Sequence, residues 1–292
     1  MATALEQGVA SKGGSSVLID EYTATWCQIC AVVDPLVPIF LEPNGERVAY
    51  VSIHPDDGID LLGNNASTTR IDWLLGDPVG TPTFIFDGGE KLIGSVTPSQ
   101  LHSELLRAES ARPRFSELQL SVSREASALI LELVLTGVLG EGEMLSLLIT
   151  EDGVSSFDPA GEPMESDHVL RAMISVELSA DDSNLVLAAP DDTHAAWNAS
   201  ASTISVILRA TVNISGDWDI GSLGFVGIHE ARTSSGHSVL GAVQVVQRES
   251  PDVEKSTNAL WLLAAGTVLA GGIALASGML FGISRTRSTS EE

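Results

Sequence analysis

Hydrophobic residues in the first third of the chain come in short, continuous runs. Residues 17–22 and 47–53 are predicted as buried strands because each run is apolar and only six or seven residues long. Residues 83–86 are predicted as a further strand, and an Asp-Gly-Gly-Glu turn leads from it into a returning strand. A helix is expected over 99–108, with Pro113 beyond its end. Strands mixed with helices predict an α/β segment.

The pattern changes to strict alternation from about residue 115 to residue 247. Apolar and polar residues alternate in short runs, and Gly, Asp and Ser separate the runs. No helical period is sustained over this part of the chain. Short alternating runs with turn residues between them predict an antiparallel, all-β sandwich of the Ig-like kind. The runs lie at 118–122, 128–135, 144–149, 169–178, 185–188, 202–212, 223–228 and 239–246.

A third pattern, a long run without charge, follows at residues 259–283. Its 25 residues exceed the roughly 20 that a helix needs to cross a bilayer, so a transmembrane helix is predicted. Arg285 and Arg287 follow at once, which places the tail in the cytoplasm and the preceding domains outside. Residues 1–15 show no signal-peptide pattern, so a tail-anchored cytoplasmic protein stays open as the alternative.

These changes in pattern predict the domain organisation. The expected parts are a flexible N-terminal segment (1–15), an α/β domain (16–112), a β-sandwich domain (114–248), a polar stalk (249–258), the transmembrane helix (259–283) and a short tail (284–292).

Charge and composition narrow the classes of partner. The chain has 39 acidic and 15 basic residues, a net charge of −24, which argues against nucleic acid because phosphates require Lys and Arg. Hydrophobic residues make up 44% of the chain, enough for packed cores. The chain has only 2 cysteines, so no framework of structural disulfides is available.

Both cysteines lie in one stretch, Trp26-Cys27-Gln28-Ile29-Cys30, between a predicted strand and a predicted helix. A Cys-x-x-Cys pair in this context is typical of thiol–disulfide chemistry. A helix N-terminus favours the thiolate, so we expect Cys27 to attack a substrate disulfide and Cys30, one turn further on, to resolve the mixed disulfide. The alternative is a structural disulfide or an inert buried pair.

Several motifs in order strengthen the redox interpretation. An apolar strand, the Trp-Cys-x-x-Cys, Pro35, the Gly-Thr-Pro-Thr of residues 80–83 and a Gly-Gly hairpin followed by a helix occur in sequence. With these motifs, residues 16–110 resemble the thioredoxin superfamily. Two features depart from the family: its first strand and helix are missing or reduced, and Gln28-Ile29 matches neither its reducing nor its strongly oxidising members. The redox direction therefore stays open.

The resemblance implies roles for four further residues. Glu21 would be a buried acid that relays a proton to or from the resolving cysteine. Pro82 would be cis, keep metal away from the thiols and shape the substrate groove. The backbone of Thr81 would pair with an extended substrate, and Trp26 would form an apolar lip. From the residues alone, Glu21 facing solvent and Trp26 packing in the core are the alternatives.

The sequence thus predicts a membrane-anchored thiol–disulfide oxidoreductase that acts on protein disulfides or dithiols. No organic cofactor and no metal are expected. The expected partners are protein thiols or disulfides and the lipid bilayer through residues 259–283, and a transmembrane redox partner stays open. The alternatives are a non-enzymatic adhesion or scaffold protein that uses the β-sandwich, and a copper-handling protein that uses the two thiols. His54 is weighed as a metal ligand but is expected to be a loop residue.

Overall fold

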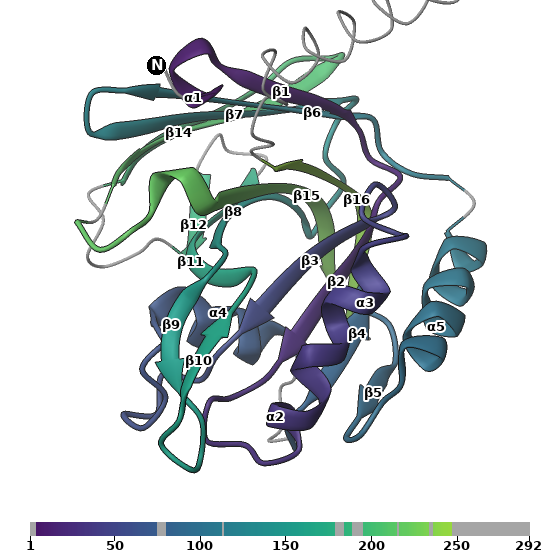
Figure 1. The fold of residues 1–292 in the computed structure, drawn as a ribbon. Coiled ribbons are helices and arrows are strands. Elements are labelled where there is room, and N and C mark those ends of the chain that lie inside the picture. Colours follow the sequence, from purple (N-terminus) through teal and green to yellow (C-terminus); the bar gives the residue numbers. More distant parts are fainter. Residues whose placement is uncertain are drawn as a thin grey trace, which may run out of the picture. The chain divides into compact units, whose positions relative to one another are not determined.

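The strands of the described chain form two large β-sheets and one separate hairpin (Figure 1). The computed structural model describes residues 4–74, 80–112, 114–178, 184–188, 195–214, 216–233 and 236–246. The nine-stranded sheet contains, in spatial order, β16 (Gly236–Val246), β15 (Leu223–Thr233), β8 (Glu143–Glu151), β11 (Val169–Leu178), β3 (Val48–Ile53), β2 (Val17–Tyr22), β4 (Thr83–Phe86) and β5 (Lys91–Ile93), and β12 (Asn184–Ala188) pairs with β11.

The second sheet has five strands, all antiparallel. Its order is β1 (Val9–Gly13), β6 (Leu118–Glu125), β7 (Ala128–Thr136), β14 (Ser205–Asn213) and β13 (Ala195–Ala201). The separate hairpin consists of β9 (Val154–Phe157) and β10 (Pro163–Ser166). The helices are α1 (Ala4–Gln7), α2 (Cys30–Val33), the 3₁₀ turn η1 (Asp34–Leu36), α3 (Val37–Leu41), α4 (Asn65–Leu74), α5 (Pro98–Ala111) and the 3₁₀ turn η2 (Ile220–Ser222).

The burial pattern explains the layers. Strands β6 and β7 bury every second residue, such as Leu118, Leu120 and Leu133, because only one face of the five-stranded sheet is covered. Strand β8 buries both faces: Leu147 packs toward the five-stranded sheet and Leu148 packs on the opposite side. The nine-stranded sheet is therefore the middle layer of this part of the molecule.

Two further apolar clusters complete the core. One lies between β8, β11, β15 and β16 on one side and β2, β3 and α4 on the other, and it includes Leu18, Val51 and Met173. The other packs α3 and α5 on the opposite face of β2, β3 and β4, with Phe40, Phe84 and Leu105. Helix α5 begins at a capping box between Thr97 and Gln100, with Pro98 in its first turn, which fixes where the helix starts.

The early and late strands join at more than one place. Strand β3 pairs in parallel with β11 through Val169 and Ser52, and the Ser52 N–H donates to the His168 carbonyl oxygen at 2.9 Å. Strand β16 also reaches the first part of the chain, since the Val239 N–H donates to the Asp87 carbonyl oxygen at 3.0 Å. Residues far apart in sequence thus share one sheet and one core.

The predicted fold class is wrong. An α/β thioredoxin-like domain followed by an all-β Ig-like sandwich and a transmembrane helix was expected. The described residues instead form a β-rich unit in which β2, β3, β4 and β5 extend the sheet of β8, β11, β15 and β16. Alternating burial shows which face of a strand is covered, but it does not show which strand lies beside it.

The expected membrane anchor is also corrected. None of the helices in the described ranges combines the length and the apolar character that crossing a bilayer requires, and the longest, α5, has 14 residues. The predicted span at 259–283 lies outside the described residues. The prediction of a single-pass protein anchored by its C-terminal helix therefore has no support among the described residues.

Candidate functional site

The cysteine pair lies at the end of the middle layer, in the segment that leaves β2. Cys27 sits in a turn in which its N–H donates to the Ala24 carbonyl oxygen at 3.1 Å, and Cys30 is the first residue of α2. The two form a disulfide with a Cα–Cα distance of 5.2 Å. Cys27 is 7% exposed and Cys30 is 1% exposed, so both cysteines are buried and Cys27 is the more accessible of the two.

The expected position of Cys27 needs a small correction. Helix α2 begins at Cys30 and not at Cys27, and it gives way after Val33 to a 3₁₀ turn that contains Pro35. A proline has no N–H to donate, so a regular α-helix does not continue through it. The Cys30 N–H still points at the Cys27 Sγ atom, at 3.1 Å, and a backbone donor at this distance favours a thiolate.

Thr81 and Pro82 approach the disulfide from a different segment, just before β4. The Cys27 Sγ atom lies 3.6 Å from the Thr81 carbonyl oxygen. The peptide bond between Thr81 and Pro82 is cis, which matches the expectation for Pro82. The structure therefore brings Cys27 and Cys30 together with the Thr81–Pro82 peptide.

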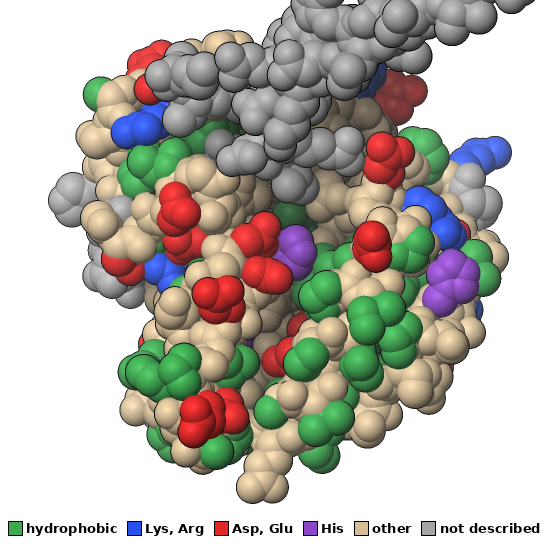
Figure 2. Space-filling view, in the orientation of Figure 1, with side chains coloured by type: hydrophobic (Ala, Val, Ile, Leu, Met, Phe, Trp, Pro, Cys, Tyr) green, Lys and Arg blue, Asp and Glu red, His purple; other side chains and the backbone are tan. Residues whose placement is uncertain are grey.

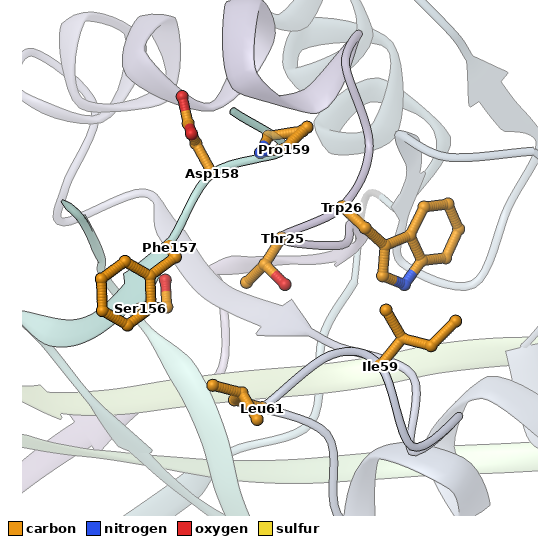
Figure 3. A pocket seen from close by; sticks show the side chains of 8 residues that line it. All are labelled: Thr25, Trp26, Ile59, Leu61, Ser156, Phe157, Asp158 and Pro159. Atoms are coloured by element: carbon orange, nitrogen blue, oxygen red, sulfur yellow. The ribbon is translucent and has the colours of Figure 1, made fainter. Parts of the chain in front are cut away.

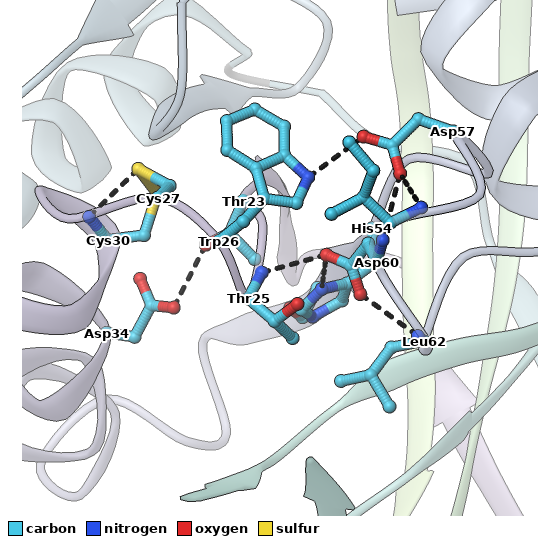
Figure 4. Close-up of polar contacts among 12 residues, drawn as sticks. Thr23, Thr25, Trp26, Cys27, Cys30, Asp34, His54, Asp57, Asp60 and Leu62 are labelled. Atoms are coloured by element: carbon cyan, nitrogen blue, oxygen red, sulfur yellow. Dashed lines mark hydrogen bonds and ion pairs between the residues drawn. A yellow bond between two sulfur atoms is a disulfide. The ribbon is translucent and has the colours of Figure 1, made fainter. Parts of the chain in front are cut away.

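Two buried carboxyl groups lie behind the cysteines. Glu21 on β2 accepts a hydrogen bond from the Tyr50 hydroxyl. Asp34 accepts one from the Thr23 hydroxyl at 2.9 Å (Figure 4). Asp34 follows Cys30 by one turn, and its N–H donates to the Cys30 carbonyl oxygen. Glu21 was predicted, but Asp34 was missed.

The electrostatics of these two carboxyl groups favour the protonated forms. Burial raises the pKa of Glu21 well above its usual range, and the neighbouring charge of Asp34 raises it further. Burial raises the pKa of Asp34 to about 6, although the Thr23 hydroxyl opposes the change. Glu21 Oε1 and Asp34 Oδ1 have no other hydrogen-bond partner, so one proton between the two groups satisfies both oxygens.

A second set of polar contacts holds the loop that precedes α4 against the cysteine segment (Figure 4). Asp60 accepts hydrogen bonds from the Thr25 N–H at 2.8 Å and contacts His54 Nδ1 at 3.0 Å. Burial opposes the ionised form of Asp60, but the contacts with His54 and with backbone N–H groups outweigh it and lower the pKa. Trp26 donates from Nε1 to Asp57 at 2.8 Å, which fixes the indole beside Cys27.

Trp26 is half-exposed, at 41%, and it belongs to a pocket rather than to the core. The pocket has a volume of about 170 Å³. Figure 3 shows the cysteine segment on one side of it, the loop before α4 on a second side and the β9–β10 hairpin on a third. Its lining consists of Thr25, Trp26, Ile59, Leu61, Ser156, Phe157, Asp158 and Pro159.

Elsewhere, a buried ionic cluster joins the first and last parts of the chain. Arg70 on α4 donates to both carboxylate oxygens of Asp20 at 3.0 Å and to Glu230 on β15 at 2.8 Å. His237 and Ser146 also contact Glu230. Arg70, Asp20 and Glu230 are fully buried, and no member of the cluster lines the pocket, so we assign it to the fold.

A metal site was not predicted, and His54 has no cysteine contact among its hydrogen bonds. His54 is buried between Asp60 and Ser52. Within the described ranges, no group of three or more His, Cys, Asp or Glu residues is arranged to hold a metal ion.

Comparisons with known proteins give a fold and no family. No family model matches the chain, and no curated protein matches it. A crystal structure of protein AGR_C_4864 from Agrobacterium tumefaciens is similar over 82% of this chain and 97% of that chain, with a TM-score of 0.51 and 13% identity. At this identity the likeness shows a shared fold alone.

Two further solved structures match shorter parts of the chain. Both are family 9 carbohydrate-binding modules from Caldicellulosiruptor kristjanssonii. The complex with cellotriose covers 44% of this chain and 65% of that chain at 10% identity, with a TM-score of 0.28. The complex with glucose covers 45% and 71% at 11% identity, with a TM-score of 0.29. Scores this low carry no argument about this chain.

The predicted resemblance to the thioredoxin superfamily, with a fused sandwich and a membrane anchor, is corrected on these findings. The structure that shares the fold does so over most of both chains, across the early and the late strands together. The described part of the chain is β-rich, with one sheet running through both. The short motifs around the cysteines describe a local arrangement and do not define the whole fold.

Proposed function

We propose that the protein carries out thiol–disulfide exchange with other proteins through Cys27 and Cys30. The observation that supports this most is the disulfide itself, between Cys27 (7% exposed) and the more deeply buried Cys30 (1% exposed), close to two protonatable carboxyl groups. A disulfide that only braces a fold does not need an adjacent proton reservoir.

The exchange consists of two successive attacks by a thiolate on a disulfide. In the dithiol form, the Cys27 thiolate attacks a substrate disulfide, a mixed disulfide forms and one substrate thiolate leaves and takes up a proton. Cys30 then loses its proton, attacks the Cys27 sulfur and releases the second substrate thiol. The protein is oxidised by two electrons and the substrate is reduced by two. The same steps run backwards when the protein starts as the disulfide and the substrate as a dithiol.

Glu21 and Asp34 supply the proton step in this proposal. Cys30 is buried, so water does not readily carry its proton away. A carboxyl pair that holds one proton near neutral pH accepts the proton from Cys30 when it attacks and returns it in the reverse direction. Thr81 offers its carbonyl oxygen to the Cys27 thiol and its backbone to an extended substrate.

Single-cysteine variants test the proposal. Cys30→Ser should accumulate a mixed disulfide at Cys27 when it is incubated with glutathione disulfide, and Cys27→Ser should accumulate none, as measured by mass spectrometry. The wild-type protein as the disulfide should oxidise reduced, unfolded ribonuclease A. A Cys30→Ser variant that forms no mixed disulfide with either probe would overturn the proposal.

The redox direction needs the reduction potential of the pair. A value near about −270 mV assigns the protein to reduction of substrate disulfides, and a value near about −120 mV assigns it to oxidation of substrate dithiols. Equilibration with glutathione buffers gives this value directly.

A second candidate is non-enzymatic binding by the sandwich of the two large sheets. The observation that favours it is the share of the described chain that these strands occupy, since the cysteine segment is a small part of the molecule. The carbohydrate-binding modules supply only the choice of probes here. Calorimetric titration with glucose and cellotriose tests this candidate, and absence of heat with both contradicts carbohydrate binding.

A further inference from the structure

The pocket beside Trp26 combines an apolar lining with a buried polar group that has no partner. Phe157 is 57% exposed, Leu61 is 75% exposed and Ile59 is 68% exposed, although all three are large apolar side chains. Figure 2 shows hydrophobic side chains gathered on this face, over α2, α3 and the β9–β10 hairpin. Apolar groups in such a cluster are expected to be covered by a bound molecule.

Ser156 gives the second, independent observation. Its side chain lines the pocket, the residue is 95% buried (5% exposed) and its Oγ atom has no hydrogen-bond partner among the described residues. A buried hydroxyl without a partner costs free energy, so a ligand that supplies a donor or acceptor here gains affinity. The hairpin therefore offers a polar contact directly beside an apolar one (Figure 3).

The position of the pocket decides what fills it. Trp26 and Thr25 line the pocket and directly precede Cys27 in the chain. A molecule that forms a disulfide with Cys27 therefore has two residues of the pocket lining next to its point of attachment. A ligand that fills the pocket needs an apolar side chain to contact Phe157 and Leu61 and a polar group to contact Ser156. One amino-acid residue of a polypeptide supplies both, through its side chain and its backbone.

We infer that the pocket binds the residues next to the reacting cysteine of a protein substrate and selects substrates with a large apolar side chain there. This inference rests on the proposed thiol–disulfide exchange. The charge of the rim sets a further preference. Asp158 lines the pocket and Asp57 holds Trp26, so a basic or neutral neighbour is favoured over an acidic one. Ser156 and Phe157, the lining residues that select the substrate side chain, belong to the β9–β10 hairpin. This hairpin lies more than a hundred residues after the cysteines in the chain.

The test uses Cys30→Ala, in which Cys27 is a single thiol. Peptides with one cysteine, activated as the mixed disulfide with 5-thio-2-nitrobenzoate, are attacked at the peptide sulfur, and the coloured thiolate leaves. One peptide has Leu and Lys next to the cysteine, a second has Ser in place of Leu, and a third has Glu in place of Lys. The free disulfide of the same reagent is the small probe that does not reach the pocket.

The Leu peptide should react about tenfold faster than the Ser peptide, since burial of one Leu accounts for such a ratio. The Glu peptide should be about threefold slower than the Lys peptide at low salt. Adding Phe157→Ser should reduce the Leu preference to about twofold, and adding Ser156→Ala should slow all peptides about threefold. Ile204→Ser, in the turn between β13 and β14, is the matched control because Ile204 is 75% exposed, and it should change nothing.

Each outcome decides one of the two proposals. Loss of the Leu preference in Phe157→Ser, with an unchanged rate for the small probe, supports the pocket. An unchanged Leu preference in Phe157→Ser overturns the pocket and leaves the exchange reaction in place. Failure of Cys27 to react with the small probe overturns the exchange reaction itself.

Discussion

Two buried clusters of acidic residues use the same kinds of side chain in opposite ways. Behind the disulfide, no Arg or Lys of the described residues acts on Glu21 or Asp34, and burial raises the pKa of both although His54 opposes the change at Asp34. In the ionic cluster, Glu230 faces Arg70. Burial alone would raise its pKa, but the guanidinium and His237 lower it well below its usual range. The first arrangement holds a proton, and the second holds fixed charges. Burial alone therefore does not decide what a carboxyl group does; a guanidinium in direct contact does.

The largest expected effect comes from removing Arg70, the guanidinium of the ionic cluster. We expect Arg70→Met to lower the free energy of unfolding by about 3–5 kcal/mol, because Asp20 and Glu230 then remain buried as unpaired charges. Denaturation in guanidinium chloride at pH 7 measures the change. The control is Arg47→Met, which removes a part-exposed pair with Glu109 and should cost less than about 1 kcal/mol. Equal losses in the two variants would contradict the assignment of the ionic cluster to the fold.

The second prediction concerns the proton held by Glu21 and Asp34 behind the disulfide. Glu21→Gln keeps an acceptor for the Tyr50 hydroxyl but removes the titrating group. We expect the rate of exchange with glutathione disulfide to fall about tenfold or more near pH 7, with little change in stability. The pH–rate profile should lose one inflection. Glu42→Gln, at an exposed position, is the matched control. A slower rate with an unchanged profile would show that Glu21 acts through structure only.

The smallest effect is a difference in how stability depends on pH. A carboxyl group with a raised folded pKa stabilises the protein below its unfolded pKa, and this contribution disappears as the pH rises through the folded value. For Asp34 the window lies between about 4 and about 6. Glu230 has the opposite pH dependence because its folded pKa is lowered. Its contribution to stability is present at higher pH and is lost as the pH falls.

Asp34→Asn should therefore remove part of the decline in stability between pH 4 and pH 7, by on the order of 1 kcal/mol. Glu230→Gln should instead remove part of the decline on the acid side. Urea denaturation at several pH values separates the two. A variant of Asp34 that leaves the slope above pH 4 unchanged would show that this carboxyl group is ionised throughout.

Local patterns in the sequence predicted many elements but not their neighbours. The runs at 17–22 and 47–53 became β2 and β3, and the alternating runs became strands of the two large sheets. Strand β1 was missed because its residues are small and polar and the pairing partner, β6, lies far along the chain. The junction of β3 with β11 was missed because burial does not identify a partner strand.

The candidate site shows the same limit. Cys27, Cys30, Glu21 and Thr81 could be found because a short motif marks each of them. Asp34 had only its spacing after Cys30 as a signal. Phe157 had no signal, because its place beside Trp26 depends on how the late strands pack, and no local pattern encodes that.

The shared sheet has a consequence for the growing chain. Synthesis delivers β2 and β3 early, but their neighbours β11 and β16 follow more than a hundred residues later. Until then α4 gives the apolar surface of Leu18 and Val51 its early cover, and the contacts with the late strands form slowly because the separations are long. The core beside the cysteine segment is therefore completed only after the late strands have been synthesised. A chain that stops before β16 is expected to aggregate rather than fold.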